Sequence, residues 1–177
     1  VLTNDDLSKM VETNDEWIRT RTGIVSRHIV ETETTSVIAG NAVANAIKDS
    51  GLQPADIDVL ILASITPDNT TPSTATKIAA SLGFRPGVPA FDISAACSGF
   101  VYALTLADNM IRLGQVKNAV VAGAECLSKI VDWTDRNTCV LFGDGAGAVV
   151  LRAKETDGLS TDTGVLSTCI YSDGSQY

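Results

Sequence analysis

The sequence predicts an α/β protein with a mixed, mostly parallel sheet that packs on a buried central helix. Short apolar runs of strand length alternate with longer segments of helical periodicity, an order that is typical of parallel α/β sheets. The run from Ile57 to Ile65 is almost continuously apolar, as expected for a strand buried on both faces. The segment from Cys97 to Leu113 is apolar on almost every side for three turns, so this helix should lie inside the protein.

Two helices are predicted before the first buried strand. Thr13 and Glu16 have the spacing of a capping box, which predicts Thr13 as the N-cap of a short helix over residues 14–20. A second, alanine-rich helix is expected over residues 37–49, where Gly51 closes it.

A third helix should follow the polar loop after the buried strand. Thr71 and Pro72 suit an N-cap followed by proline at the first helical position, and they predict a helix over residues 73–82. A strand over residues 89–94 comes next. It runs into a tight turn that contains Cys97 and opens the long apolar helix.

The last third of the chain is predicted to form strands, over residues 118–124, up to Leu151 and over residues 164–171. The glycine-rich stretch 143–147 is expected to be a tight turn before the second of these. It is not a dinucleotide- or phosphate-binding loop, because it precedes a strand instead of a helix and lacks the Walker lysine and serine. Asp92 and Asp144 are expected to be buried structural carboxylates.

Composition excludes several classes of protein. The 177 residues carry a net charge of −8, which argues against general nucleic-acid binding. No apolar run approaches the roughly 20 residues of a membrane-spanning helix. The four cysteines lack the paired spacing of a disulfide framework or zinc site, which favours a reducing cytoplasm. We expect one domain or a large piece of one, in the cytoplasm, without a signal peptide or a metal.

Cys97 is the strongest candidate for a catalytic residue. It lies at a strand-to-helix turn, where a nucleophile is held exposed at the edge of a sheet. The free N–H groups and the dipole of a helix N-terminus favour a thiolate there. The alternative is a buried structural cysteine, which is the commoner fate of a free thiol.

A second candidate site lies on the first short helix. Trp17 and Arg21 are four residues apart and share a helix face, so the two planar groups could hold a flat base. The stretch from Trp17 to Val30 is a basic island in an acidic chain, because it also contains Arg19, Arg27 and His28 and no acidic residue. Such an island would suit an adenine nucleotide with phosphates, such as coenzyme A. The alternative is a solvated basic helix face.

Three segments resemble the family of β-ketoacyl-acyl-carrier-protein synthase III, a condensing enzyme of the thiolase superfamily. They are Asp15 to Ile24, Asp92 to Phe100, and Thr134-Asp135-Arg136 followed by Phe142 to Ala148, in the family's order. The resemblance implies a thiolase-like fold and covers essentially the whole chain.

The resemblance also implies roles for particular residues. Cys97 would take the acyl group from an acyl-coenzyme A, and its backbone N–H would be half of the oxyanion hole. Trp17 and Arg136 would enclose the adenine, with Arg21 and Thr13 close to the nucleotide.

An acyl channel is implied at Thr71, Leu141 and Phe142. A threonine at position 71 would leave room for a primer longer than acetyl. The alternative for Thr71 is that it serves only as an N-cap.

The implied activity is the start of fatty-acid synthesis by a homodimer. An acyl-cysteine would condense with malonyl-acyl carrier protein in a decarboxylative Claisen reaction. The coenzyme A thioester is a substrate, and no cofactor is implied.

The family's catalytic histidine and asparagine come from the second half of a longer chain, and His28 lies beside the coenzyme A segment instead. Residues 1–177 are therefore expected to be an N-terminal half that lacks its first strand and the whole C-terminal half. Two alternatives are a ketosynthase of secondary metabolism with another starter, and a non-catalytic half that binds coenzyme A or completes a heteromer.

Overall fold

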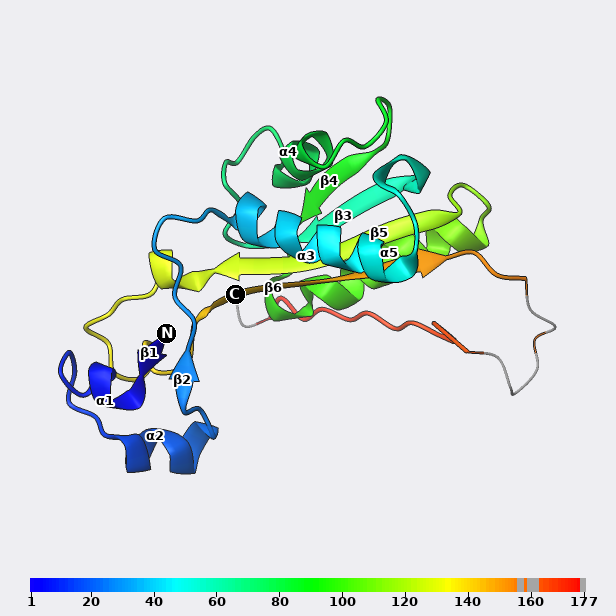
Figure 1. Ribbon diagram of the computed structural model, residues 1–177. Coiled ribbons are helices and arrows are strands. Elements are labelled where there is room, and N and C mark those ends of the chain that lie inside the picture. The colour runs from blue at the N-terminus through cyan, green and yellow to red at the C-terminus, as the bar shows by residue number, and fades with distance from the viewer. Residues whose placement is uncertain (156–157, 159–162, 176–177) are drawn as a thin grey trace.

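The computed structural model describes all residues except 156–157, 159–162 and 176–177 (Figure 1). It has two parts: a larger α/β body and a small lobe at one end. The body contains a four-stranded sheet in the order β4-β3-β5-β6, and the lobe contains the antiparallel pair β1 and β2. No helix in the part of the chain that the structure describes is long and apolar enough to cross a membrane.

The sheet of the body is mixed and mostly parallel, as predicted. Strand β3 (Val59–Ala63) pairs in parallel with β4 (Ala90–Ile93) on one side and with β5 (Asn118–Cys126) on the other. Strand β6 (Asp144–Arg152) runs antiparallel to β5. The five residues of β3 are all buried, which confirms the interpretation of the apolar run as an inner strand.

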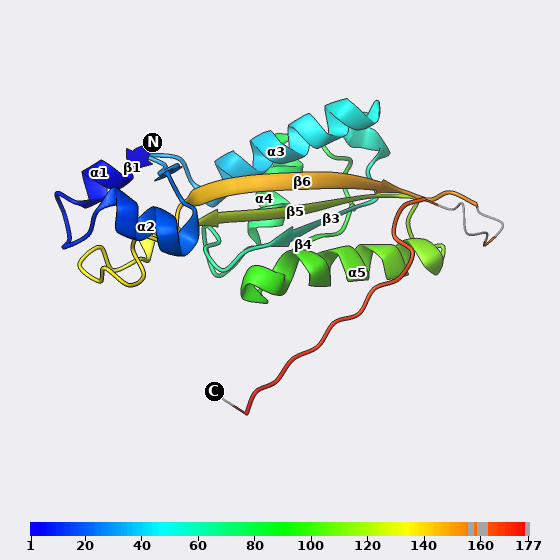
Figure 2. The same ribbon diagram turned by 90° about the horizontal axis from the view of Figure 1, so that it is seen from below.

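The alternation of side chains along β3 and β5 builds two separate cores. Leu60 and Leu62 face helices α3 (Thr35–Ser50) and α4 (Thr74–Ser81) on one side of the sheet. Val59 and Ile61 face α5 (Gly99–Arg112) on the other side, as Figure 2 shows edge-on. Because successive strand side chains point to opposite faces, one apolar run fills both cores.

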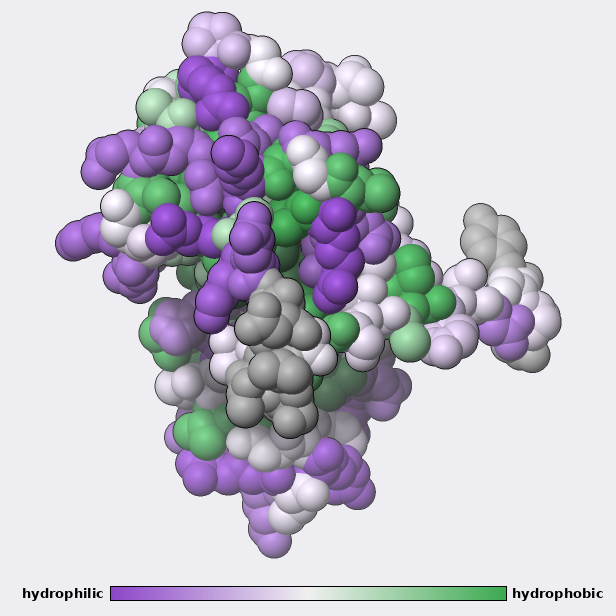
Figure 3. All heavy atoms as spheres, turned by 90° about the vertical axis from the view of Figure 1, so that its right-hand side faces the viewer, coloured by the Kyte–Doolittle hydropathy of each residue, from purple (hydrophilic) through white to green (hydrophobic). Residues whose placement is uncertain are grey.

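Helix α5 is buried only on the side that faces the sheet, so the prediction of a helix buried all round is wrong for this structure. Ala103 and Ala107 are fully buried against the sheet, whereas Val101 and Leu106 are 46% and 41% exposed. Figure 3 shows, on one face of the molecule, apolar residues at the surface among polar ones. The side of α5 that faces away from the sheet would be buried only under a further layer of structure. The apolar pattern of the helix does not show whether such a layer is present.

The predicted final strand is also absent from the described part of residues 164–171, which has no ladder partner. This segment instead runs along α5 and away from the sheet (Figure 2). Tyr102 donates its hydroxyl hydrogen bond to the carbonyl of Tyr171 (3.0 Å), and Arg112 donates to that of Val165 (2.8 Å).

The glycine-rich stretch is part of a strand and not a tight turn. Gly145 and Gly147 lie inside β6, opposite Glu125 and Gly123 of β5, and neither has a positive φ. Pairing with β5 holds the backbone of these glycines in an extended conformation. That pairing is a long-range contact and is not visible in the local sequence.

The small lobe packs around a third apolar core. It consists of β1 (Leu2–Thr3), α1 (Asn4–Leu7), α2 (Asp15–Thr22) and β2 (Ser26–Arg27). Leu7 and Ile18 are fully buried there against Cys139 and Val140. Residues more than 110 positions apart therefore share one core, and the loop before β6 belongs with the lobe.

Two predicted N-caps are wrong by one or two residues. Asn14, not Thr13, caps α2, since its side chain accepts a hydrogen bond from the Trp17 amide (2.7 Å). Ser73, not Thr71, caps α4. The peptide bond between Thr71 and Pro72 is cis and lies ahead of that cap.

Short 3₁₀ turns complete the body, at Pro54–Asp56 (η1), Ala96–Ser98 (η2) and Leu127–Lys129 (η3). Asp92 at the end of β4 accepts hydrogen bonds from the amides of Thr74 and Ala75, so this carboxylate caps α4. Asp144 accepts from the Val30 amide and from the amide and hydroxyl of Ser128, and it joins the loop after β2 to η3. Both carboxylates thus hold structure, as predicted, but they are half-buried.

Asp68 fixes the loop between β3 and α4. Its carboxylate accepts hydrogen bonds from the amide and hydroxyl of Ser36 and forms an ion pair with Lys77 at 2.7 Å. Burial by itself raises the pKa of Asp68, but the contacts with Lys77 and Ser36 outweigh it and lower the pKa to about 2. The Asp68 side chain is 7% exposed, so solvent screens these contacts weakly.

We expect Asp68→Asn to lower the free energy of unfolding by about 2 kcal/mol at neutral pH. The folded pKa lies below the ordinary value of 3.8, so the unfolded chain binds the proton first as the pH falls. The contribution is therefore complete above about pH 4 and is lost as the pH falls through about 2. Urea unfolding across this range measures it, with the exposed Asp49→Asn as control. A loss that stays the same at pH 2 would contradict the assignment.

Candidate active site

Cys97 lies in the turn η2, between the end of β4 and the start of α5. The residue before it, Ala96, has a φ of 46°, a left-handed conformation that is uncommon for residues other than glycine. This turn leaves the Cys97 side chain exposed. The chain around it is tightly placed, since a Cβ on Gly99 would lie 3.2 Å from the Ala63 Cβ. The geometry is that of a nucleophile elbow, with a 3₁₀ turn inserted before the helix.

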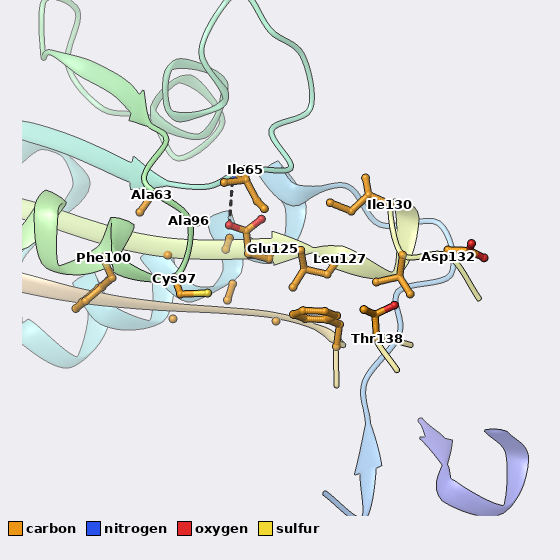
Figure 4. Close-up of a pocket in the computed structure, with 17 residues that line it drawn as sticks. Ala63, Ile65, Ala96, Cys97, Phe100, Glu125, Leu127, Ile130, Asp132 and Thr138 are labelled. Carbon is orange, nitrogen blue, oxygen red and sulfur yellow. Dashed lines mark hydrogen bonds between the residues drawn. The ribbon is translucent and has the colours of Figure 1, made fainter. Parts of the chain in front are cut away.

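The Cys97 thiol opens into an apolar cleft of about 650 Å³ (Figure 4). Strand ends, η2 and the loop before β6 supply its walls. Its apolar side chains include Ile65, Phe100, Leu127, Ile130 and Phe142. A cleft of this size and character suits an acyl chain better than a polar or ionic ligand.

The three residues predicted for the acyl channel separate in the structure. Phe142 lines the Cys97 cleft. Leu141 is 46% exposed and is not part of the cleft lining, and Thr71 lies in the exposed loop before α4, also outside the lining.

Glu125 is a residue of the cleft that the sequence reasoning missed. It lies near the end of β5, and its carboxylate accepts hydrogen bonds from the Ile65 amide (2.9 Å) and the Thr66 hydroxyl (2.6 Å). The only local signal was a single acidic residue in an otherwise uncharged strand. Its position beside Cys97 depends on the pairing of β5 with β3.

The predicted nucleotide site comes together at α2. The guanidinium groups of Arg21 and Arg136 lie over the Trp17 ring, 4.6 and 4.8 Å from its centroid. Arg136 reaches Trp17 from the loop before β6. Because Arg136 now contacts the ring directly, a base can enter between them only if its side chain moves. The Thr13 hydroxyl is buried without a hydrogen-bond partner among the described residues.

Arg27 does not belong to the basic island, contrary to the sequence prediction. It is 6% exposed and donates hydrogen bonds to the carbonyls of Leu2 and Val140. Its aliphatic stem lies where a side chain on Gly143 would be, since a Cβ there would be 2.8 Å from the Arg27 Cβ. Arg19 pairs with Asp15 at 2.8 Å, which leaves Arg21 and Arg136 as the arginines at the ring.

The four cysteines divide by exposure. Cys97 and Cys169 are exposed, whereas Cys126 and Cys139 are buried. Burial raises the pKa of the Cys139 thiol, which lowers its thiolate fraction further.

Iodoacetamide at neutral pH should therefore label Cys97 and Cys169 and spare Cys126 and Cys139 in the folded chain. Peptide mass mapping measures each rate, and the urea-unfolded chain, in which all four should react, is the control. Labelling of Cys126 in the folded chain as fast as Cys97 would contradict the described burial.

The sequence of this chain is similar to known proteins. The family model described as 3-oxoacyl-[acyl-carrier-protein] synthase III matches residues 91–174. A β-ketoacyl-[acyl-carrier-protein] synthase III of Paramagnetospirillum magneticum is 56% identical over 178 residues, which are 100% of this chain and 55% of the relative. One of Rhodospirillum centenum is 57% identical over 98% of this chain and 54% of the relative.

Solved structures agree with the sequence comparisons. The 3-oxoacyl-[acyl-carrier-protein] synthase III of Aquifex aeolicus VF5 superposes with a TM-score of 0.85 at 55% identity, over 88% of this chain and 50% of that one. That of Pseudomonas aeruginosa PAO1 gives a TM-score of 0.83 at 40% identity, over 88% of this chain and 48% of that one.

The sheet, the elbow and these superpositions define an α/β fold of the thiolase-like class. Within this class, the chain is similar over its whole length to enzymes named β-ketoacyl-[acyl-carrier-protein] synthase III. It spans about half the length of the curated relatives it matches.

Proposed function

We propose that this chain carries the acyl-accepting part of a β-ketoacyl-acyl-carrier-protein synthase III. In this proposal Cys97 takes an acetyl or short acyl group from coenzyme A and passes it to malonyl-acyl carrier protein, which starts a fatty-acid chain. The observation that carries the proposal is the exposed Cys97 at a left-handed elbow, opening into an apolar cleft. The similarity to enzymes named for this activity supports it.

In the first step the Cys97 thiolate attacks the carbonyl carbon of the acyl thioester. The new C–S bond forms, the carbonyl oxygen becomes an oxyanion, and the bond to the sulfur of coenzyme A then breaks. The Cys97 backbone N–H, held in η2, is one proposed donor to that oxyanion. No group is oxidised or reduced, so coenzyme A enters as a substrate thioester and no redox cofactor is required.

In the second step malonyl-acyl carrier protein loses carbon dioxide, and the resulting enolate attacks the acyl carbon on Cys97. The product is a 3-oxoacyl-acyl carrier protein, and the Cys97 thiolate leaves. The enolate charge needs its own hydrogen-bond donors. His28, the one histidine of the sequence, lines a different cavity, between the loop after β2 and helix α3. We therefore propose that residues 1–177 act as an N-terminal half and that a C-terminal half supplies these donors.

The acyl-transfer step is tested by incubating the chain with acetyl-coenzyme A and mapping the acetylated peptide by mass. The expected result is one acetyl group on Cys97 and none on Cys169, which is exposed but lies outside the cleft. Equal acetylation of both thiols would mean uncatalysed chemistry and would count against the proposal.

Trp17, Arg21 and Arg136 are the proposed nucleotide site, with Thr13 beside it. Trp17→Ala or Arg136→Ala should slow acyl transfer from acetyl-coenzyme A by about 5- to 150-fold, because loss of one stacking plane costs on the order of 1–3 kcal/mol. Transfer from an acetylated carrier protein, which has no adenine, should change much less. Mass-detected transfer rates with both donors measure this.

The matched control is Arg19→Ala, which removes an arginine of the same helix that pairs with Asp15 and not with the ring. Equal losses with both donors at Trp17 or Arg136 would indicate a role in folding instead of nucleotide binding.

Phe142 is the proposed limit of the acyl channel, because it lines the Cys97 cleft. Leu141 and Thr71 could contribute only through contacts with another chain, since both lie outside the cleft lining and are exposed.

A homodimer is proposed because it would provide this second chain. Strand β4, which leads to Cys97, has no ladder partner on its outer side among the described residues. A cytoplasmic location fits the free cysteines.

A further inference from the structure

The cleft beside Cys97 carries negative charge and no positive charge in its lining. Glu125 and Asp132 are its two ionisable carboxylates, and no lysine, arginine or histidine lines it among the described residues. Figure 4 shows the Glu125 carboxylate on the side of the cleft next to Ala96 and Cys97, and Asp132 at the far end. Glu125 is therefore the carboxylate closest to the reacting thiol.

Hydrogen bonds hold the Glu125 carboxylate in place. The Ile65 amide donates to one oxygen at 2.9 Å, and the Thr66 hydroxyl donates to the other at 2.6 Å. Thr66 is itself fixed, because its hydroxyl oxygen accepts from the Cys126 amide at 2.8 Å. Glu125 forms no ion pair within the described part of the chain, so no cation neutralises it.

Asp132 differs in its surroundings. It is exposed and accepts hydrogen bonds from the amide and hydroxyl of Thr134 in its own turn. Water screens a charge at this position more strongly than one in the half-buried wall beside Cys97. The two carboxylates thus form a natural comparison within one cleft.

We propose that Glu125 is a specificity-determining residue that admits uncharged acyl groups to Cys97 and rejects those that end in a carboxylate. The inference rests on the proposed function, in which Cys97 carries the acyl group. An acyl chain on Cys97 lies in the cleft that Glu125 lines, and a second carboxylate there would be repelled at short range in a partly desolvated wall. Repulsion of this kind is worth on the order of tenfold in rate.

The decisive experiment does not depend on coenzyme A. Iodoacetamide and iodoacetate alkylate a thiol with the same chemistry and differ in one negative charge. Glu125→Gln removes the charge and retains an oxygen for the Ile65 amide. In this variant the iodoacetate-to-iodoacetamide rate ratio at Cys97 should rise about tenfold. A ratio cancels any change in thiolate fraction or in access that both reagents share.

Two controls define the site of the effect. The same ratio at Cys169, which is exposed and outside the cleft, should not change in Glu125→Gln. Asp132→Asn should change the Cys97 ratio much less than Glu125→Gln. The proposal is overturned if the ratio at Cys97 is unaltered by Glu125→Gln, if Asp132→Asn reproduces the effect, or if Cys169 follows Cys97.

Two acyl donors then test whether the charge of Glu125 affects which acyl group Cys97 accepts. Butyryl-coenzyme A and succinyl-coenzyme A differ in a terminal carboxylate, and Glu125→Gln should raise the succinyl-to-butyryl ratio of Cys97 acylation about tenfold. Equal slowing of both would show that Glu125 only supports the loop, and would overturn the proposal. If wild-type Cys97 accepts neither thioester, the proposed function fails, while the alkylation ratio still decides whether Glu125 repels anions at Cys97.

Discussion

Cys97→Ala is expected to abolish acyl transfer from acetyl-coenzyme A to the chain, a loss of roughly 10³-fold or more in rate. No other thiol is available in the cleft among the described residues, because Cys126 and Cys139 are buried and Cys169 lies outside the cleft. The substitution removes one exposed sulfur and leaves the elbow to its backbone, so the fold should be retained. Intact mass after incubation with acetyl-coenzyme A measures the transfer.

Cys169→Ala is the matched control for this experiment, since it removes the other exposed thiol of the described chain. Its acetylation should equal that of the unaltered chain. Transfer that survives Cys97→Ala and disappears in Cys169→Ala would contradict the assignment of the nucleophile. Unfolding curves of both variants separate a loss of chemistry from a loss of structure.

The second large effect concerns condensation by this chain without a partner. With acetyl-coenzyme A and malonyl-acyl carrier protein, it should form 3-oxoacyl product at close to the background rate. Each preorganised donor to a developing oxyanion is worth roughly 10²–10³ in rate. Two donors for the malonyl enolate are expected from a second half-fold, and His28 lies in another cavity. The labelled product on the carrier protein is measured.

Addition of a separately made C-terminal half from a relative, such as that of Paramagnetospirillum magneticum, should restore product if the two halves associate. The apolar residues on the uncovered side of α5, including Val101 and Leu106, provide a surface for that association. A C-terminal half that lacks its histidine is the matched control. Efficient condensation by the chain alone would contradict the two-half proposal.

The elements that the sequence predicted well are those whose signal is local. The apolar run of β3 is buried on both faces, and Gly51 ends α3 in the left-handed conformation. The turn with Cys97 lies where the flanking apolar runs predicted it, between a strand and a long helix. In each case a period of two, a helical period or a capping residue lies within a few positions of the feature it determines.

The caps show how narrow that local information is. Thr13 and Asn14 are both good N-cap residues, and so are Thr71 and Ser73. The structure selects Asn14 and Ser73, because their side chains reach the amides of the first helical turn. N-cap propensity alone cannot decide which of two neighbouring residues caps a helix when both are good N-cap residues.

The candidate sites depended more on tertiary structure. Arg21 meets Trp17 through helical spacing alone, and the sequence predicted that pair. Arg136 was assigned to the same site only by family resemblance, and the packing of Cys139 and Val140 under the lobe is what brings its loop to Trp17.

By itself, the sequence determined the order of strands and helices from α3 to β6, the inner strand β3 and the elbow that exposes Cys97, because short-range periodicity and capping encode them. Tertiary structure alone placed Glu125 in the Cys97 cleft, since only the pairing of β5 with β3 brings its carboxylate to the amide of Ile65. It likewise buried Arg27, which the sequence assigned to a basic surface. A sequence shows which residues are charged but not where their side chains lie. Pairing between strands that are distant in the sequence decides which of these charges face a ligand.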